Sequence, residues 1–268
     1  MCILFVAINA HPKYPLIICA NRDEFHHRPT VPAHFWPPEE NILAGKDLQA
    51  GGTWFGINKQ GQIAGVTNLR VPQKNPEAMR SRGELITMTL NSGSLVCPNW
   101  LVEHSDNYQP FNLIFGQGTD LYCFNSINKD TVKLADGFHA ISNGALDDIW
   151  PKMAKGQQAL EAAISQSSSI EVQVLLQLMK DDSQPQDNEL PNTGVGIEWE
   201  RRLAAIYIRH PDYGTRSTSI LLEDAEGGMH FTEVRYDGKG RQLGQQDFHL
   251  TLPAEPPTKP DCLIANLI

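Results

Sequence analysis

The sequence has little positive charge. Lys and Arg together number 22 against 31 Asp and Glu, which gives a formal net charge of −9 at pH 7. This balance opposes non-specific attraction to nucleic-acid backbones and to anionic lipid headgroups. We therefore expect no nucleic-acid partner.

The sequence has no long apolar runs, and we do not expect a leader peptide. The short apolar segment at residues 2–8 is followed by His11 and Pro12 instead of a small-residue cleavage site. No run in the sequence approaches the roughly 18 apolar residues that a membrane helix needs. We expect a cytoplasmic protein without a transmembrane segment.

Cysteine and glycine motifs are sparse. The five cysteines are an odd number at wide spacing and include no CxxC pair, so we expect neither a disulfide framework nor a metal site. A Walker A loop and a GxGxxG fingerprint are missing, because Gly116 and Gly118 have no third glycine after them. Phosphate-loop and dinucleotide chemistry are therefore disfavoured.

What remains is typical of a soluble globular protein. The chain has 268 residues, of which 41% are hydrophobic and 20% are charged. No linker-like segment divides it. We expect a single domain over residues 1–268, with a Pro-rich tail from about residue 253.

Runs of β-branched residues predict strands, and helical spacing of apolar residues predicts helices. Because strands group at both ends and helices in the middle, the pattern predicts an α+β fold with antiparallel sheets. Residues 28–39 are expected to form an ordered loop or an extended crossing, since proline cannot donate to a sheet ladder. Residues 198–208 fit helix and strand equally. The predicted strands are 2–9, 15–20, 53–58, 62–68, 111–115, 121–125, 132–134, 216–222 and 228–236, and the predicted helices are 81–91, 147–164 and 170–180.

Cys2 is the first candidate for chemistry. Removal of Met1 is expected because the second residue is small, and it would leave an α-amine and a thiol on one residue. The ordinary pKa values of these two groups lie close enough for the amine to accept the thiol proton near neutral pH. The alternative is that Cys2 is a small apolar residue at the start of a buried strand.

Four polar residues, Asn21, Arg22, Asp23 and Glu24, end the strand that is predicted to pair with the strand of Cys2. The guanidinium could lower the thiol pKa and hold a ligand carboxylate, and the aspartate could hold the α-ammonium group. A solvated surface pair at the strand end is the alternative. Strand alternation is expected to place Arg22 and Asp23 on opposite faces unless the strand ends or bulges there.

These residues belong to a longer series of motifs, and with it the chain resembles the NRDE family, also called the transport and Golgi organisation family. That family is similar to the N-terminal-nucleophile cysteine hydrolases, such as conjugated bile acid hydrolases and penicillin V acylases. The resemblance covers nearly the whole chain. It rests on Met1-Cys2, NRDE at 21–24, RPT at 28–30, GGTWFG at 51–56, TNLR at 67–70, SRGEL at 81–85, FNL at 111–113, ISN at 141–143, WPK at 150–152 and YGTRS at 213–217.

The resemblance implies a four-layer αββα sandwich, in which two antiparallel sheets lie between helical layers. It also implies that Cys2 is the nucleophile and that Asp23 is the acid near its amine. Asn68, at the end of the second hairpin, and Asn143 correspond to active-site asparagines, of which Asn143 would be an oxyanion donor. The alternative for each asparagine is a turn or strand-end role.

One motif departs from the acylase pattern. Those enzymes have Arg-Asn-x-Asp where this chain has Asn-Arg-Asp-Glu, so Arg22 lies directly beside Asp23. Arg22 stays a catalytic candidate, and amide hydrolysis stays open. Arg216, in the YGTRS motif, is a second candidate cation for a ligand carboxylate.

The resemblance also implies a carrier function, because family members are associated with haem movement and with lipid or acyl-coenzyme A homeostasis. A hydrophobic cleft with arginine at its rim would suit haem as well as an acyl chain. Cys2, His26 and His27 are possible axial ligands. The remaining predicted ligand-binding residues are Asn21, Glu24 and Arg216.

The sequence and the family resemblance lead us to expect one of two functions. The favoured one is a cytosolic protein that binds and traffics haem, or a similar small lipophilic ligand with a carboxylate or acyl group, between haem donor and acceptor proteins. The alternative is a Cys2-dependent amidase or thioesterase that acts on acyl amides or acyl-coenzyme A through an acyl-enzyme. Hydrolysis would need no cofactor, whereas haem would be bound as cargo.

Overall fold

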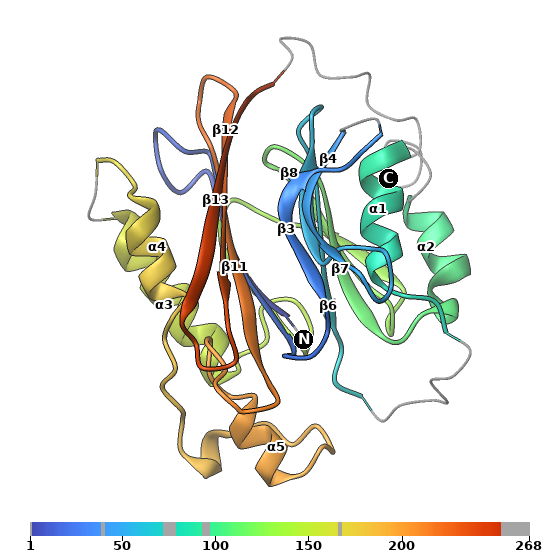
Figure 1. The fold of residues 1–268 in the computed structure, drawn as a ribbon, viewed down its shortest axis with the longest axis vertical. Helices are drawn as coiled ribbons and strands as arrows, with labels where there is room; N and C mark the ends of the chain where they lie inside the picture. The colour runs from blue at the N-terminus through green and yellow to red at the C-terminus, as the bar shows by residue number, and fades with distance from the viewer. Residues whose placement is uncertain (1, 39–40, 72–78, 93–96, 166–167, 253–268) are drawn as a thin grey trace.

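Two antiparallel sheets form the middle of the molecule, and helices cover the outer face of each (Figure 1). This arrangement confirms the predicted α+β class and the four-layer αββα sandwich. The computed structural model describes residues 2–38, 41–71, 79–92, 97–165 and 168–252. The Pro-rich tail from residue 253 lies outside the described residues. The single-domain prediction therefore stays a prediction where it includes that tail.

The first sheet has six strands and contains both ends of the described chain. The second sheet has seven strands and contains the middle of the sequence. In spatial order the first sheet is β10 (Gly137–Ile141), β1 (Cys2–Ile8), β2 (Leu16–Phe25), β11 (Tyr213–Glu223), β12 (Gly228–Tyr236) and β13 (Gln242–Thr251). The second sheet is β3 (Thr30–Phe35), β4 (Ile42–Asp47), β5 (Phe55–Asn58), β6 (Gln62–Asn68), β7 (Phe111–Gln117), β8 (Asp120–Asn125) and β9 (Asp130–Lys133).

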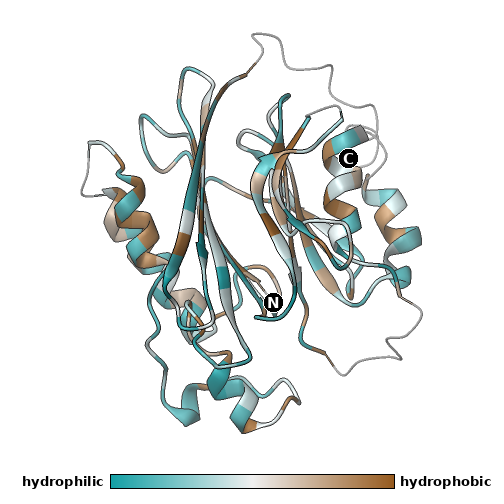
Figure 2. Cartoon of the chain, viewed as in Figure 1, coloured by the Kyte–Doolittle hydropathy of each residue, from teal (hydrophilic) through white to brown (hydrophobic). Residues whose placement is uncertain are grey.

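The helices form the two outer layers. Figure 2 shows α5 as mostly hydrophilic (teal), while hydrophobic residues (brown) are frequent along the helices that pack on the sheets. The helices α3 (Pro151–Ser165) and α4 (Val172–Leu178) cover the first sheet, and α1 (Gly83–Ser92) and α2 (Pro98–His104) cover the second. The remaining helical segments are α5 (Ile197–Arg202) and the short 3₁₀ turns η2 (Ser105–Asn107) and η3 (Asp187–Glu189).

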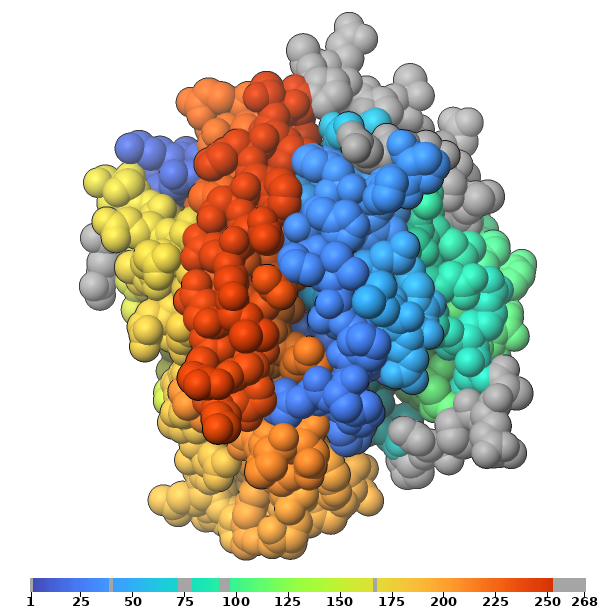
Figure 3. Space-filling model, in the orientation of Figure 1, coloured from blue at the N-terminus to red at the C-terminus, as the bar shows by residue number. Residues whose placement is uncertain are grey.

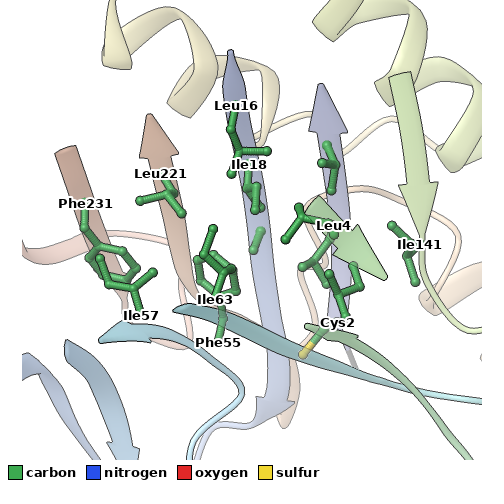
Figure 4. Packing of buried hydrophobic residues seen from close by; sticks show 14 of the residues in the cluster. Cys2, Leu4, Leu16, Ile18, Phe55, Ile57, Ile63, Ile141, Leu221 and Phe231 are labelled. Atoms are coloured by element: carbon green, nitrogen blue, oxygen red, sulfur yellow. The ribbon is translucent and has the colours of Figure 1, made fainter. Parts of the chain in front are cut away.

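Strand β1 is buried on both faces, which explains its continuous apolar sequence. Leu4 points to the space between the sheets, where it belongs to the same core cluster as Phe55 (Figure 4). Phe5 points the other way and packs against α3. A Cβ atom at Gly156 would lie only 2.0 Å from the Phe5 ring, so glycine is required for the close approach of α3 to the sheet.

Most of the predicted elements are present, with three refinements. Within the stretch expected to be an ordered loop or an extended crossing, residues 30–35 are extended and form an edge strand, β3, and Pro32 lies where the register of β3 against β4 shifts. The predicted helix at 147–164 begins later, at Pro151, a residue suited to the first helical position. The ambiguous segment at 198–208 is helical only over α5. Elements that were not predicted are β4, β10, β13 and α2.

Two further features bear on the sequence predictions. Cys2, Cys19 and Cys123 are free thiols. None of the helices in the described part of the chain combines the length and apolarity that crossing a membrane requires.

Candidate functional site

A pocket of about 270 Å³ lies where β1 begins and β2 ends. Both sheets and the segment before α1 contribute to its walls. Figure 4 shows Cys2 at the end of the row of apolar residues that fills the space between the sheets. The pocket is lined by Cys2, Arg22, Asp23, Glu24, Arg28, Asp47, Ala50, Gly52, Thr53, Trp54, Val66, Asn68, Met79, Arg80, Ser81, Arg82, Gly83 and Gln109.

The first hairpin brings Cys2 and Arg22 together. The two residues are directly opposite each other in the antiparallel pairing of β1 with β2, so their side chains lie on the same face. Cys2 is 9% exposed, and burial raises the pKa of its thiol. The Arg22 guanidinium lies 4.3 Å from the centre of the Trp54 ring, and its Nη2 donates to Asp47 Oδ2 over 2.9 Å.

Asp47 holds a second arginine in the same wall. Arg28 Nε donates to Asp47 Oδ2 over 2.6 Å, and the amide of Ala50 donates to Oδ1. Burial acts to raise the pKa of Asp47, but these hydrogen bonds and the charges of Arg28 and Arg22 hold that pKa below its ordinary value. Asp47 is therefore a fixed anion that orients two cations.

Three guanidinium groups of the pocket wall form a set that we call the arginine cluster: Arg22, Arg28 and Arg82. Arg82 Nη1 donates to the backbone carbonyl of Pro110 over 3.1 Å, so a neutral group holds it in place. Arg28 lies 3.7 Å from the carboxylate of Glu24. The cluster gives the pocket the donors that bind carboxylate or phosphate groups.

Asp23 faces the opposite side of β2 from Arg22, as strand alternation predicts. Asp23 Oδ1 accepts a hydrogen bond of 2.7 Å from Thr215 Oγ1, and its backbone carbonyl accepts one from Tyr213 Oη. The register of β2 against β11 shifts beside this position, between Thr215 and Ser217. Burial raises the pKa of Asp23.

Asn143 lies behind the pocket, and both its amide oxygen and its amide nitrogen form hydrogen bonds. Its Oδ1 accepts from Arg70 Nη2 over 3.1 Å and from Lys152 Nζ over 3.3 Å, and its Nδ2 donates to the backbone carbonyl of Asn68 over 2.9 Å. Lys152 also donates to the carbonyl of Leu203. Burial lowers the pKa of Lys152, because its charged form loses hydration.

A buried ion pair supports Asn143. Arg70 Nη1 donates to Glu200 Oε2 over 2.7 Å, and the two side chains are only 6% and 4% exposed. Glu200 Oε1 also accepts from the backbone amide of Thr193. The Arg70 guanidinium lies 5.3 Å from the Trp150 ring. We call Asn143, Lys152, Arg70 and Glu200 the buried network.

The structure brings together some of the sequence-predicted residues and separates others. Cys2, Arg22, Asp23, Glu24 and Asn68 line the pocket, and Asn143 lies directly behind Asn68. Sequence reasoning missed Asp47, Arg28 and Trp54 in the pocket wall. It also assigned no role to Arg82, Arg70 or Lys152, although the SRGEL, TNLR and WPK motifs contain them.

The other predicted ligand-binding residues lie away from the pocket. Asn21 Nδ2 donates to the carbonyls of Met179 and Ile206, so Asn21 ties β2 to the helical layer. His26 Nε2 donates to the carbonyl of His210, and the exposed His27 ring packs near Phe25.

Arg216 also lies outside the pocket, since its Nη1 donates to the carbonyls of Phe25 and Arg28. Of the three possible axial ligands, Cys2 lines the pocket, whereas His26 and His27 are not among its lining residues. Among the described residues there is no cluster of three or more side chains that could hold a metal ion.

An αββα sandwich whose first strand opens with a thiol at a pocket has the fold of the N-terminal-nucleophile hydrolases. A solved structure of the Caenorhabditis elegans N-acylethanolamine-hydrolyzing acid amidase ortholog matches it with a TM-score of 0.51 at 11% identity. The match covers 83% of this chain and 92% of that chain. This likeness shows the shared fold.

The family is shown by sequence. The family profile described as Transport and Golgi organisation 2 matches residues 1–238. The Transport and Golgi organization protein 2 homolog of Bos taurus is 35% identical over 260 residues, which is 87% of this chain and 92% of that protein. The Homo sapiens homolog is 34% identical over 255 residues, with the same shares covered. The chain belongs to the Transport and Golgi organisation 2 family, which confirms the predicted resemblance.

Proposed function

We propose that the protein is a cytoplasmic hydrolase that uses Cys2 to cleave an amide or thioester bond in a small molecule carrying an anionic group. The observation that supports this proposal is a single pocket wall that carries both the Cys2 thiol and the arginine cluster. The thiol is a nucleophile, and the guanidinium groups suit a carboxylate or phosphate on the substrate.

The proposed reaction has two stages. After removal of Met1, the α-amine of Cys2 accepts the thiol proton, and Sγ attacks the carbonyl carbon of the substrate. The tetrahedral intermediate expels the amine or thiol leaving group, which receives that proton. Water then attacks the Cys2 thioester, transfers a proton through the α-amine to Sγ, and releases a carboxylic acid.

Two asparagines suit stabilisation of the oxyanion. Asn68 lines the pocket, so its side-chain amide is the candidate donor to the oxyanion. Asn143 donates to the backbone of Asn68 and is the candidate positioning residue. If Asn68 is the oxyanion donor, the Asn68→Ala variant should lose about 10²–10³-fold in kcat.

The decisive experiment is a panel of acyl-coenzyme A and acyl-amide substrates, with wild type compared with Cys2→Ala by intact-mass analysis. We expect wild type to lack Met1 and to carry an acyl adduct that Cys2→Ala does not form. Cys19→Ala is the matched control, since Cys19 is also a buried free thiol but points toward the outer helical layer. Retention of Met1 in active protein, or an adduct on Cys2→Ala, would refute the proposal.

A carrier of haem or another lipophilic carboxylate is the second candidate. The arginine cluster and the Trp54 ring favour it, because they would bind a carboxylate beside an apolar plane. Thr53, Asn68 and Ser81 make much of the remaining wall polar, which favours the hydrolase over the carrier. A haem titration should give a Soret shift and transfer to an apo-acceptor if the carrier proposal is correct. Without either signal at micromolar protein, the carrier is excluded.

A further inference from the structure

A second cavity of about 30 Å³ lies behind the wall that Arg22 and Trp54 form. Both residues also line the Cys2 pocket, so they separate the two spaces. The cavity lies beneath the seam where β3 (blue) and β13 (red) run side by side at the surface (Figure 3). It is distinct from the pocket in which the proposed reaction occurs.

The strand register places three polar side chains in a row at this cavity. Ser217 on β11 is opposite Arg22 on β2 and opposite Arg235 on β12. Residues at matching positions in neighbouring strands have their side chains on the same face of the sheet. Ser217 is therefore flanked by a guanidinium on each side.

Each of these three residues, and Glu233, carries a buried polar atom without a hydrogen-bond partner in the described part of the chain. The atoms are Arg22 Nη1, Ser217 Oγ, Arg235 Nε and Glu233 Oε2. Arg22, Ser217 and Glu233 are only 5%, 3% and 1% exposed. Buried polar groups in folded proteins nearly always have a partner. A guest in the cavity is within reach of all four residues, because all four line it.

The charges around the cavity favour a negative guest. Arg216 is a third guanidinium in the wall, and its Nη1 donates to the neutral carbonyls of Phe25 and Arg28. The opposing carboxylate is Glu233, whose Oε1 already accepts from the amide of Ala33. Burial raises the pKa of Glu233 to about 7, so part of the population at neutral pH carries no charge there.

We propose that this cavity is a binding site for a small monovalent inorganic anion of the chloride class, held by Arg22, Ser217 and Arg235. An anion accepts from all three donors at once, and Glu233 adds a fourth donor when its carboxyl group is protonated. The volume exceeds the roughly 10–15 Å³ that one water requires, so the cavity has room for one small ion. The site does not depend on the proposed hydrolase activity.

The direct test is diffraction from wild-type crystals grown with sodium bromide, measured at the bromine absorption edge. We expect an anomalous peak within the cavity, between the guanidinium groups of Arg22 and Arg235. Density for water without an anomalous peak, or bromide only at the protein surface, would overturn the proposal. Neither result depends on whether the protein hydrolyses any substrate.

A solution test uses the melting temperature at constant ionic strength. Replacing methanesulfonate, which is too large for the cavity, with chloride should raise the Tm of wild type by roughly 2–4 °C in a saturable manner. Arg235→Gln should abolish this rise, and Lys239→Gln, on an exposed turn, should retain it. An equal chloride effect in Arg235→Gln and wild type would contradict the assignment. If Arg235→Gln does not fold, the bromide experiment on wild type decides whether the cavity binds an anion.

Discussion

Two ion pairs near Cys2 have similar charged groups in different surroundings. On the inner face of β2, Arg22 is paired with Asp47, and both line the pocket although their side chains are only 5% and 10% exposed. Arg70, which follows β6, is paired with Glu200 of α5 in the buried network, with 6% and 4% of their side chains exposed, and neither is among the residues that line the pocket. A sealed pair fixes geometry, while charges at a pocket wall remain available to a ligand.

Substitutions in the two ion pairs should therefore change different measured quantities, namely stability and ligand binding. Removing one partner of a sealed ion pair leaves an uncompensated buried charge, which lowers stability. Removing a guanidinium from the pocket wall weakens ligand binding and changes stability little, because the pocket lets water solvate what remains. The four predictions below test this contrast, from the largest expected effect to the smallest.

The largest effect is expected for Glu200→Ala. The substitution leaves the Arg70 guanidinium buried without its carboxylate, so the free energy of unfolding should fall by about 3–5 kcal/mol. Urea denaturation measures this change. Glu198→Ala is the matched control, because Glu198 pairs with Arg201 at the surface and should change stability by less than about 1 kcal/mol. Equal losses in the two variants would contradict a special role for the buried network.

Glu233 tests what burial does to a carboxylate that lies on the inner face but outside the Cys2 pocket. Burial raises its pKa from 4.5 to about 7. Between these pH values the folded state holds a proton that the unfolded state releases, so stability should fall as the pH rises and level off above 7. The loss should reach about 3 kcal/mol.

Denaturation at several pH values measures this slope in wild type and in Glu233→Gln. The variant should lose this part of the slope and keep the part due to Glu223, whose pKa burial also raises. A wild-type slope that survives unchanged in Glu233→Gln would show that Glu233 is charged in the folded state throughout this range.

The arginine cluster is tested with Arg82→Gln. A hydrogen bond to a charged group contributes about 1.5–3 kcal/mol, so an anionic substrate such as an acyl-coenzyme A should bind roughly 10–100-fold more weakly. KM or Kd should rise by this factor, with a small change in Tm. Arg241→Gln is the control, since Arg241 pairs with Asp237 at a distant surface. A loss of stability as large as that of Glu200→Ala would place Arg82 with the structural residues instead.

The sequence was sufficient for the parts of the site that depend on local contacts. Cys2 and Arg22 are joined by one hairpin, so strand pairing predicts that they meet. Asp47 was missed because it ends β4, whose six residues include Gly45 and Lys46 and give a weak strand pattern. Strand β13 was missed because most of its side chains are polar or exposed, as befits a sheet edge.

The buried network could not be predicted from the sequence, because its contacts join residues that no local sequence pattern relates. Lys152 and Glu200 lie on helices, where a charged residue is typical of a solvated face. Their partners, Asn143 and Arg70, are distant in the sequence or belong to another layer. Motif resemblance marked TNLR and WPK as shared segments, but only the fold shows that both contribute donors to one asparagine.

The smallest effect is expected for Arg216→Gln, which tests the sequence-based candidate that the structure places outside the Cys2 pocket. Arg216 donates to backbone carbonyls and faces the small second cavity, with the Arg22–Trp54 wall between it and the pocket. Its charge reaches a pocket ligand only across that wall, so binding of an anionic substrate should change by less than about twofold. Side-by-side titrations of Arg216→Gln and Arg82→Gln with the same acyl-coenzyme A measure the difference. If Arg216→Gln weakened binding as much as Arg82→Gln, the ligand would have to extend past Trp54, and the inner face would form one continuous binding surface.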